Sequence, residues 1–474
     1  MTSLKSNLLV CSLLGLSTHA SLAAADSYWP LNDGSGTVAV NAGTGSNGTL
    51  NGGVNWVTDP QRGTVAEFNG AAGTYIAAGT VGVITPASNF TWAFWSKADA
   101  AQPLNNDIMV GNRQPDSGWA KFTPNQFEYR DNAPVTFNDN INYPDFTAST
   151  WTHNSVVKQG RLMTYFRNGI ALGNVVSTGT ENLDAGTPLY FGGDAAAGGE
   201  GWQGRLSDVA TWTSAVPVTS VSGIARGIYT PANAPGSPAA AVLAPVLSDN
   251  FSSGLANWTA TERGLENVGP AGLNAPSTAG NQVVLGGTVT SQYWFGSSIE
   301  SNLSFNSSLE TEISVDRVSL TGSGTAFRSS LWIYGDADHY LHFSQNFNEG
   351  GWGYNAKDVG GTGAASATGS GNNLALADSL DADTGSHEMG LNVIPTGVAG
   401  QFNVEIRLDG VLQAVQGFSN FPSEYKVILT GQTRAIGDSV NAVFDNLLVQ
   451  QVPEPTAAML ALAALGLSAT RRRR

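Results

Sequence analysis

Acidic residues recur at alternate positions of one short segment, LETEISVDRVSL. Glu310 and Glu312 share parity with Asp316, and residues of like parity point to one face of a strand. Two neighbouring carboxylates can serve as the acid and the nucleophile of glycoside hydrolysis. The same spacing also fits the solvent face of a strand whose other side carries Ile313. We favour the solvent face and retain only Glu310 and Glu312 as catalytic candidates.

Other catalytic motifs are absent from the sequence or lie in the wrong context. His339 and His342 have the spacing of a metal pair on a helix, but the alternation around them favours a strand, which places them on opposite faces. GEGWQG at 199–204 matches a dinucleotide-binding pattern, yet a strand-like segment follows it instead of the required helix. HExxH, GxSxG and Walker motifs do not occur. We therefore predict that the protein is not an enzyme.

Aromatic residues in glycine-rich or polar segments are the candidates for ligand binding. An exposed ring in a loop can stack on a sugar ring, whereas burial in a core is the commoner fate of tryptophan. Both interpretations stay open from the sequence. The five candidates are Trp119, Tyr143, Trp202, Trp352 and Tyr354.

Aspartate and asparagine gather in three turn-like segments, at 139–145, 335–339 and 381–385. Oxygen ligands from such loops suit Ca²⁺, although these residues also favour turns for reasons unrelated to metal. We name Ca²⁺ as the one cofactor that the sequence would fit, without assigning its ligands.

Length and composition define the class of fold. At 474 residues the chain has room for two domains and additional segments. With 57 glycines and 12% charged residues it does not resemble a coiled coil or a charged helical bundle, and its short apolar runs indicate strands joined by turns. The net charge of −15 argues against nucleic-acid binding, which needs a basic face.

A proline- and alanine-rich segment, PANAPGSPAAAVLAP, divides the chain. It has the composition of a semi-extended linker, which we place at 232–246. The flanking segments, 26–231 and 247–451, are each long enough to bury a core of their own. We predict two β-domains.

The two halves share a hairpin pattern. RLMTYFRNGIALGNVV and FNVEIRLDGVLQAV each place two strands around a type I′ turn, Asn168-Gly169 in the first half and Asp409-Gly410 in the second. A closing strand follows each hairpin at a similar distance, which indicates one architecture for both halves. A short helix is predicted only at 217–228, where apolar residues recur at helical spacing.

The first half carries a resemblance to a known family. YWPLNDGSGTVAVNAG, NFTWAFWSKAD, MTYFRNG, LYFGG and GRLSDVATW, in this order, resemble the laminin-G-like group of concanavalin A-type jelly rolls over nearly all of 26–231. The family usually has an acidic pair in the last of these motifs, where Ser207 and Asp208 stand here. The resemblance implies a jelly-roll sandwich, often with bound calcium.

The second half resembles concanavalin-like domains in its first and last strands, DNFSSGLANW and FDNLLV. The alternating acids also resemble those of jelly-roll glycosidases of the laminarinase and lichenase type, except that Ser314 occupies the third alternate position. The fold class expected for the chain is all-β, with two concanavalin A-like jelly-roll β-sandwiches joined by the linker and with signal helices at the termini.

The N-terminal segment 1–25 has the features of a secretory signal peptide. Lys5 precedes the apolar run LLVCSLLGL, and small residues permit cleavage near Ala23 and Ala25. Cys11, the single cysteine, lies inside this segment. We expect the mature chain to fold without disulfides.

The C-terminal segment 452–474 resembles a PEP-CTERM sorting signal of Gram-negative bacteria, which exosortase-type membrane proteases recognise. Two prolines around a glutamate precede an apolar run at 456–470, and four arginines follow it on what would be the cytoplasmic side. The predicted motif comprises Val452, Pro453, Glu454, Pro455, Arg471, Arg472, Arg473 and Arg474. The apolar run would insert transiently into the inner membrane.

These observations predict an exported, exosortase-sorted protein of the cell surface or extracellular matrix. We expect it to bind glycan or exopolysaccharide without cleaving it. Two alternatives stay open: a polysaccharide hydrolase or lyase, and a structural or adhesive surface protein with a protein partner.

Overall fold

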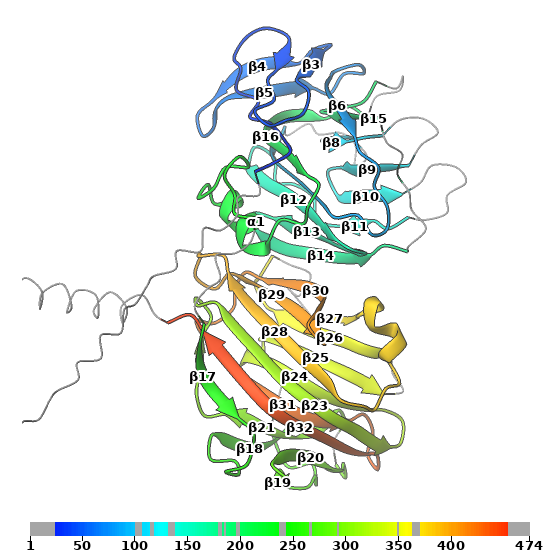
Figure 1. The fold of residues 1–474 in the computed structure, drawn as a ribbon, viewed down its shortest axis with the longest axis vertical. Helices are drawn as coiled ribbons and strands as arrows, with labels where there is room; N and C mark the ends of the chain where they lie inside the picture. Colours follow the sequence, from blue (N-terminus) through cyan, green and yellow to red (C-terminus); the bar gives the residue numbers. More distant parts are fainter. Residues whose placement is uncertain are drawn as a thin grey trace, which may run out of the picture.

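The computed structural model consists almost wholly of antiparallel β-structure, in four sheets of eight strands each (Figure 1). It describes residues 24–99, 107–113, 118–130, 138–178, 183, 186–195, 200–236, 243–264, 268–291, 293–347, 350–362 and 370–453. The predicted signal peptide up to Ala23 and the predicted sorting tail from Glu454 onward lie outside these residues. Within them, no helix is long and apolar enough to span a membrane.

Two sheets form the first sandwich. One has the order β14 (Ile170–Val176), β13 (Leu162–Arg167), β12 (Trp151–Gln159), β7 (Phe90–Ala98), β16 (Gln203–Trp212), β5 (Gly63–Asn69) and β4 (Asn55–Asp59), with β1 (Ser27–Trp29) paired to β16. The other has the order β11 (Ile141–Asn142), β10 (Gln126–Arg130), β9 (Trp119–Phe122), β8 (Val110–Gly111), β15 (Thr187–Phe191), β6 (Tyr75–Val81), β3 (Gly48–Asn51) and β2 (Val38–Ala39).

The second sandwich repeats this plan. One sheet has the order β30 (Val411–Phe418), β29 (Phe402–Leu408), β28 (His387–Pro395), β23 (Thr311–Ser323), β32 (Ser439–Gln451), β20 (Gln282–Thr288) and β19 (Ser277–Ala279), with β17 (Ala244–Asp249) paired to β32. The other has the order β27 (Ser370–Asn373), β26 (Gly351–Asp358), β25 (His339–Phe347), β24 (Phe327–Asp336), β31 (Glu424–Thr433), β21 (Phe295–Ser301) and β18 (Trp258–Arg263), with β22 (Phe305–Asn306) paired to β31. A 3₁₀ helix, η1 (Ala375–Leu380), follows β27.

The predicted hairpins correspond strand for strand. β13 and β14 meet at Asn168-Gly169, with φ of 51° and 82°, and β29 and β30 meet at Asp409-Gly410, with φ of 51° and 75°. Both central residues of each turn are left-handed, as a type I′ turn requires. The prediction of one architecture for both halves is confirmed by the matching strand orders.

A second pair of positions repeats between the sandwiches. Leu31 follows the first strand of its domain and Phe251 follows β17, and both have φ of 56°. In the closing strands, Asp208 of β16 and Asn446 of β32 also have positive φ, at 53° and 49°. Non-glycine residues rarely adopt this conformation, so its recurrence at equivalent places reflects a shared backbone path.

Each sandwich has its own apolar core, built by alternation. Phe90, Trp92 and Phe94 of β7 point into the first core, and Ile313 of β23 points into the second. The helix expected at 217–228 is α1 (Val218–Ala225), whose apolar side packs on the first domain and in one cluster with Ile394 and Val415 of the second. The all-β class and the two sandwiches are thus confirmed.

The predicted linker is shorter than 232–246. On its N-terminal side Ala234 is fully buried, and the Pro235 carbonyl accepts a hydrogen bond from Ser220 Oγ at 2.6 Å. On its C-terminal side β17 begins at Ala244, because this segment pairs with the closing strand β32. Both ends of the predicted linker therefore belong to the folded domains.

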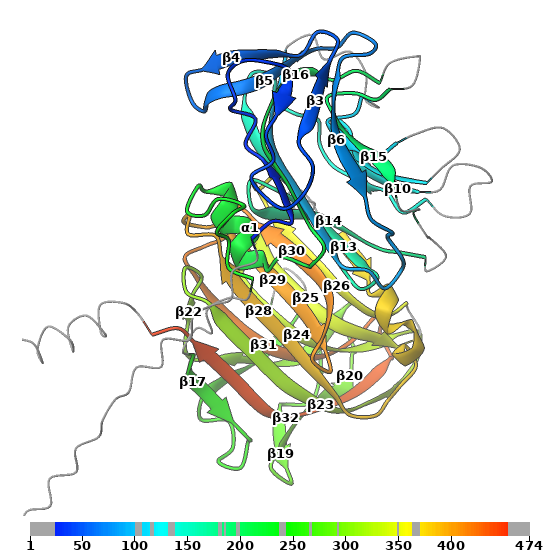
Figure 2. The same cartoon turned by 45° about the horizontal axis from the view of Figure 1, so that its top comes forward.

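The two sandwiches meet along equivalent edge strands, β14 and β30, visible at the junction in both views (Figures 1 and 2). Buried Asn403 donates from Nδ2 to the Gly169 carbonyl at 2.8 Å and accepts from the Ala171 amide at 2.8 Å. Asn174 Oδ1 accepts from the Val415 amide at 3.1 Å, and Asn174 Nδ2 donates to the Val415 carbonyl at 2.8 Å. Asparagine side chains thus bridge the two backbones.

Candidate functional site

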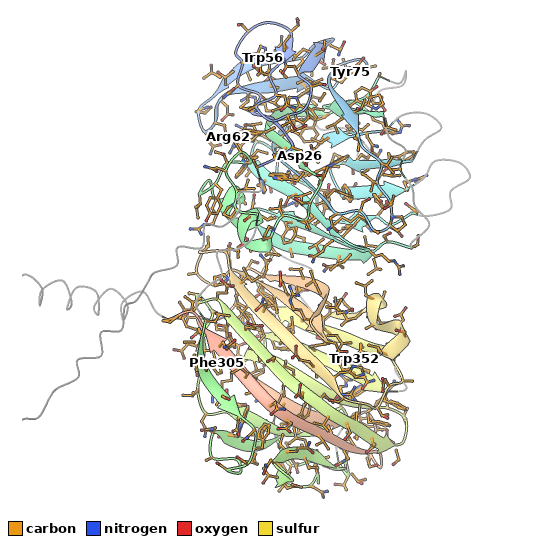
Figure 3. All side chains as sticks on the ribbon, viewed as in Figure 1. Asp26, Trp56, Arg62, Tyr75, Phe305 and Trp352 are labelled. Atoms are coloured by element: carbon orange, nitrogen blue, oxygen red, sulfur yellow. The ribbon has the colours of Figure 1, made fainter. Side chains whose placement is uncertain are left out.

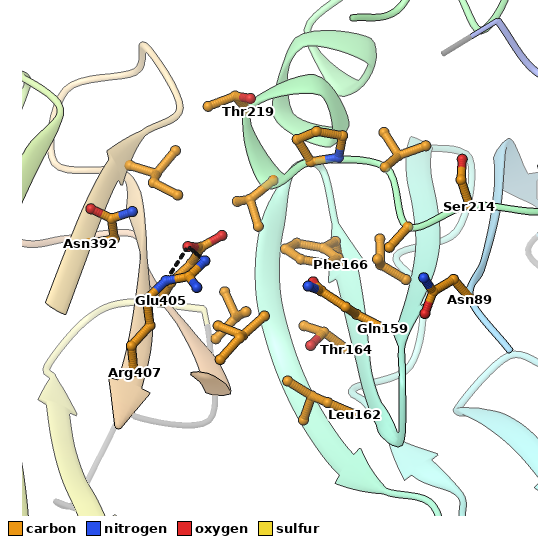
Figure 4. Close-up of a pocket in the computed structure, with 18 of the residues that line it drawn as sticks. Asn89, Gln159, Leu162, Thr164, Phe166, Ser214, Thr219, Asn392, Glu405 and Arg407 are labelled. Carbon is orange, nitrogen blue, oxygen red and sulfur yellow. Dashed lines mark hydrogen bonds and ion pairs between the residues drawn. The ribbon is translucent and has the colours of Figure 1, made fainter. Parts of the chain in front are cut away.

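An open cleft of about 470 Å³ lies between the two sandwiches (Figure 4). Its first wall comes from β13, which alternates between two environments. Met163 and Tyr165 point into the first core, and Leu162, Thr164 and Phe166 line the cleft. This wall presents mostly apolar surface.

The opposite wall comes from the second domain and is polar. Along β29, Val404 and Ile406 enter the second core while Glu405 and Arg407 line the cleft, because neighbouring residues of a strand face opposite ways. Asn392 joins them from the neighbouring strand β28. Figure 4 shows this wall facing Phe166 across the cleft.

Two carboxylates belong to the cleft. Glu405 Oε2 accepts from Arg407 Nη2 at 2.6 Å and from Nε at 3.2 Å. Glu310 lies half-buried one residue before β23. Burial raises the pKa of Glu310, and the charges of Glu405 and Glu312 raise it further. The cleft therefore favours a protonated Glu310 more than water does.

The predicted pair Glu310 and Glu312 is divided between two sites. Glu312 is exposed and lines an adjoining hollow of about 230 Å³, together with Glu388; Asn392 and Arg407 line both this hollow and the cleft. The solvent-face interpretation holds for Glu312, because Ile313 beside it lies in the core. The second carboxylate of the cleft is Glu405, which the sequence analysis missed, although the alternation of FNVEIRL already placed it on an outer face.

A hydroxyl at the rim adds to the polar character of the cleft. Thr219 of α1 lines the cleft, and its Oγ1 is buried without a hydrogen-bond partner among the described residues. Exposed Gln159 and Asn89 line the same side. The cleft therefore combines an apolar wall with carboxylates, amides and a hydroxyl.

Of the two interpretations of the five aromatic candidates, the structure supports burial and not exposed rings in loops. All are buried, with exposed fractions of 7% for Trp119, 6% for Tyr143, 0% for Trp202, 0% for Trp352 and 6% for Tyr354. The glycines around them suggested loops, but glycine here permits close packing: a Cβ on Gly204 would lie 2.9 Å from the ring of Trp202.

Trp352 and Tyr354 illustrate the same error in β26. Both alternate into the second core, while Gly353 and Asn355 between and after them lie on the opposite face of the sheet. Figure 3 labels Trp352 within the lower domain. The signal was available, since GWGYNAKD alternates as a strand does.

The two histidines behave as the alternation predicted. His339 and His342 both lie on β25 with opposite parity, and His342 Nε2 contacts Ser330 Oγ at 2.6 Å. His342 also stacks on Trp332, with ring centroids 4.2 Å apart. Burial, together with the charge of Arg328, lowers the pKa of His342 well below its usual range.

The aspartate-rich turns act largely as turns. Asp336 Oδ1 accepts from the Asp338 amide at 2.8 Å, and Asp383 Oδ1 accepts from the Gly385 amide at 2.7 Å. Across the described part of the chain, no group of three or more His, Cys, Asp or Glu side chains is placed to hold a metal. Calcium binding stays a prediction.

A buried charge cluster occupies the outer face of the first sheet. Asp59 accepts hydrogen bonds from Lys97 at 2.9 Å, Arg205 at 3.0 Å and Trp151 at 3.0 Å. Burial alone would raise the pKa of Asp59, but these donors and the Gln61 amide hold it well below its usual range. Asp59 is therefore ionised, and its role is structural because it binds the side chains of Lys97, Arg205 and Trp151 together.

A second cluster lies beside it on the same face. The Arg62 guanidinium lies 4.2 Å from the Trp95 ring centroid and pairs with Asp208, which also accepts from the Tyr28 hydroxyl at 2.6 Å. His153 is fully buried against Trp95, and neither ring nitrogen has a hydrogen-bond partner within the described residues. Burial and the charge of Arg62 lower the pKa of His153 to about 3.

Comparison with known proteins finds a family model that matches part of the first domain. A family model described as the concanavalin A-like lectin/glucanases superfamily matches residues 69–222. The laminin-G-like resemblance of the first half is confirmed at that level. A search of curated proteins finds no match.

Solved structures show similar but distant sandwiches. Domain 4 of AbnA, an extracellular arabinanase from Geobacillus stearothermophilus solved with arabinotriose, aligns with 43% of this chain and 100% of its own, at 12% identity and a TM-score of 0.36. An endo-1,3-beta-glucanase from Streptomyces sioyaensis aligns with 46% of this chain and 98% of its own, at 13% identity and a TM-score of 0.34. The binding domain of Paraclostridial Mosquitocidal Protein 1 aligns with 85% of this chain and 91% of its own, at 9% identity and a TM-score of 0.35.

Proposed function

We propose that the protein binds carbohydrate in the interdomain cleft and does not cleave it. The observation that carries this proposal is the pairing of an apolar wall, centred on Phe166, with a polar wall of Glu405, Arg407 and Asn392. A sugar presents C–H faces to the first kind of surface and hydroxyls to the second. Concave sites that combine apolar lining with a few convergent polar groups are the usual form of small-ligand pockets.

A glycan array tests the proposal. We expect the purified protein to retain oligosaccharides, and Asn392→Ala and Glu405→Gln to weaken binding about tenfold each, since the first removes a hydrogen bond to ligand and the second replaces a charged acceptor by a weaker neutral one. Glu424→Gln, an exposed carboxylate on β31, is the matched control. The array is run with calcium and with a chelator, because calcium remains a predicted cofactor.

Retention of no glycan under either condition would refute carbohydrate binding. The structural or adhesive alternative, with a protein partner, would then take its place.

A hydrolase is the second candidate, and one observation favours it. Glu310 has a raised pKa, which suits a general acid, and Glu405 provides a second carboxylate in the same cleft. This alternative predicts release of reducing ends from a polysaccharide that the array identifies, lost in Glu310→Gln. Absence of turnover by the wild-type protein leaves the non-catalytic proposal in place.

We also propose export and sorting at the cell surface or in the extracellular matrix of a Gram-negative bacterium. The support is the sequence order of the terminal segments, with Pro453-Glu454-Pro455 ahead of the apolar run. Cleavage after Ala23 would leave in place Ala25, which is buried and donates its amide to the Pro231 carbonyl at 3.0 Å.

Mass spectrometry of the protein from its host tests the sorting step. We expect Glu454→Ala to leave the C-terminal segment attached, because an exosortase would no longer recognise it. Normal processing of that variant would contradict the assignment.

A further inference from the structure

We propose that a second interdomain cavity, lined by amide side chains, binds an uncharged oligosaccharide; this inference rests on the proposed carbohydrate-binding function. The cavity measures about 540 Å³ and is formed by β11, β14, β30 and the segment from β27 into η1. β30 lies between it and the cleft: Leu412 and Val415 line the cleft, whereas Gln413, Ala414 and Gln416 line the cavity, and the two spaces adjoin at Leu162, which lines both.

The chemistry of the lining selects the class of ligand. Seven side chains carry carboxamides, and no described residue that lines the cavity is charged. The amide residues are Asn140, Asn142, Asn174, Asn372, Asn373, Gln413 and Gln416. Carboxamides both donate and accept hydrogen bonds, as sugar hydroxyls do. A charged ligand would lose its hydration without finding a counter-charge, so the lining favours a neutral one.

One acceptor in the wall lacks a partner. Gln413 is 6% exposed, and its Oε1 is buried without a hydrogen-bond partner among the described residues. Its Nε2 donates to the Val411 carbonyl at 3.3 Å. A buried acceptor without a donor is costly, and a ligand hydroxyl would supply the missing hydrogen bond.

The opposite wall of the cavity, which includes Asn174 of β14, is fixed by hydrogen bonds within the protein. Asn174 accepts from Thr164 Oγ1 at 2.8 Å and bridges to the Val415 backbone across the domain junction. Tyr354 lines the cavity beside it with a largely buried ring. A fixed wall lowers the entropic cost of binding.

The size and rim also suit an oligosaccharide. The volume lies within the roughly 300–1,000 Å³ of small-molecule sites. Asn142 and Asn373 are exposed, as is Ala375, and all three belong to the lining. The cavity is therefore open to solvent on this side.

Calorimetric titration of the purified full-length protein tests the inference. The probes are neutral hexasaccharides of glucose, mannose and galactose, with an oligogalacturonate of equal length as the charged counterpart. We expect at least one neutral probe to bind, Gln413→Leu to weaken it about tenfold, and Ala375→Trp, which fills the cavity from an exposed position, to abolish it. Val398→Trp, at an exposed loop site outside the lining, is the matched control and should bind as the wild type does.

The outcomes separate this inference from the proposed function. Undiminished binding of the neutral probes by Ala375→Trp overturns the cavity site and leaves the cleft as the binding site. Tighter binding of oligogalacturonate than of every neutral probe, lost in Ala375→Trp, overturns the assigned ligand class. Binding of no probe by the wild type, with an empty glycan array, overturns both. Because Ala375 is exposed, the filling variant keeps the test valid even where Gln413→Leu fails to fold.

Discussion

The corresponding sheets of the two domains share a strand order but differ on their outer faces. In the first domain this face holds the clustered ions around Asp59 and the Arg62–Asp208 pair. In the second domain the equivalent face carries Glu312 and Glu388, both exposed. Inward-facing residues and hairpin turns therefore specify the topology, while the outer faces remain free to take on different chemistry.

Removal of Asp59 tests this contrast with the largest expected effect. Asp59→Ala leaves Lys97 and Arg205 without their shared buried carboxylate, so we expect the free energy of unfolding to fall by about 3 to 5 kcal/mol. The matched change on the equivalent sheet is Asp316→Ala, whose partner is the Asn446 side chain and which should cost less than about 0.5 kcal/mol. Urea unfolding measures both, and equal losses would show that the two faces do not differ energetically.

Removal of Asn403 tests whether the two domains act as one unit. Asn403→Ala leaves the Ala171 amide buried without its partner, at a cost of about 1 to 3 kcal/mol, while the Gly169 carbonyl keeps only its hydrogen bond from Ser222 Oγ. Scanning calorimetry should then resolve the unfolding of the domains into two transitions. Asn441→Ala, exposed on β32, is the control and should leave the thermogram unchanged. An unaltered thermogram in Asn403→Ala would mean that Asn403 does not couple the unfolding of the two domains.

The buried histidines sharpen the comparison at acid pH. The pKa of His153 is about 3 in the native state and near 6.5 in the unfolded chain. Between pH 6.5 and pH 3, therefore, His153 is protonated in the unfolded chain but neutral in the native state. Stability therefore falls with decreasing pH by about 1.4 kcal/mol per unit. The variant His153→Leu lacks this titration. The difference in free energy of unfolding between His153→Leu and the wild type should therefore shift by about 2 kcal/mol in favour of the variant from pH 7 to pH 5, as measured by urea unfolding at both pH values.

His342 supplies the corresponding residue in the second domain. Its pKa is also depressed by burial, but its Nε2 has Ser330 as a partner, whereas neither nitrogen of His153 has one within the described chain. Acid sensitivity that is the same in the wild type and in His153→Leu would contradict a neutral, buried His153.

The smallest effect concerns the cleft. The pKa of Glu310 is raised, so its ionised form is less stable in the folded state than in the unfolded one. Glu310→Gln should raise Tm slightly at pH 7, and the gain should vanish below the usual glutamate pKa of about 4.3, where both states are protonated. Exposed Glu312→Gln should give a smaller gain at pH 7, because the Glu312 charge is the weakest of the three causes that raise the pKa of Glu310, and no gain at low pH. A gain that persists at low pH would point to packing instead of charge.

Local patterns in the sequence accounted for much of the fold. The turns at Asn168-Gly169 and Asp409-Gly410 require left-handed backbone, and the alternation through Phe90 to Phe94 marks a strand buried on both sides. Both features depend only on neighbouring residues, so they can be read without the tertiary structure.

The cleft could not be read in the same way. Glu405 and Phe166 are far apart in sequence and face each other only because β14 docks on β30. The aromatic candidates are buried for a related reason: the glycines near Trp202 suggested a loop, but Gly204 allows the backbone to lie close to the buried Trp202 ring.

The junction of β14 with β30 also has a consequence for solubility. An edge strand with free backbone groups is a template on which another chain can add, and native proteins cover or disrupt such edges. Here the side chains of Asn174 and Asn403 occupy part of each partner's exposed backbone. Either sandwich produced alone would expose an edge strand to which another chain can add. Each domain therefore protects the other from aggregation.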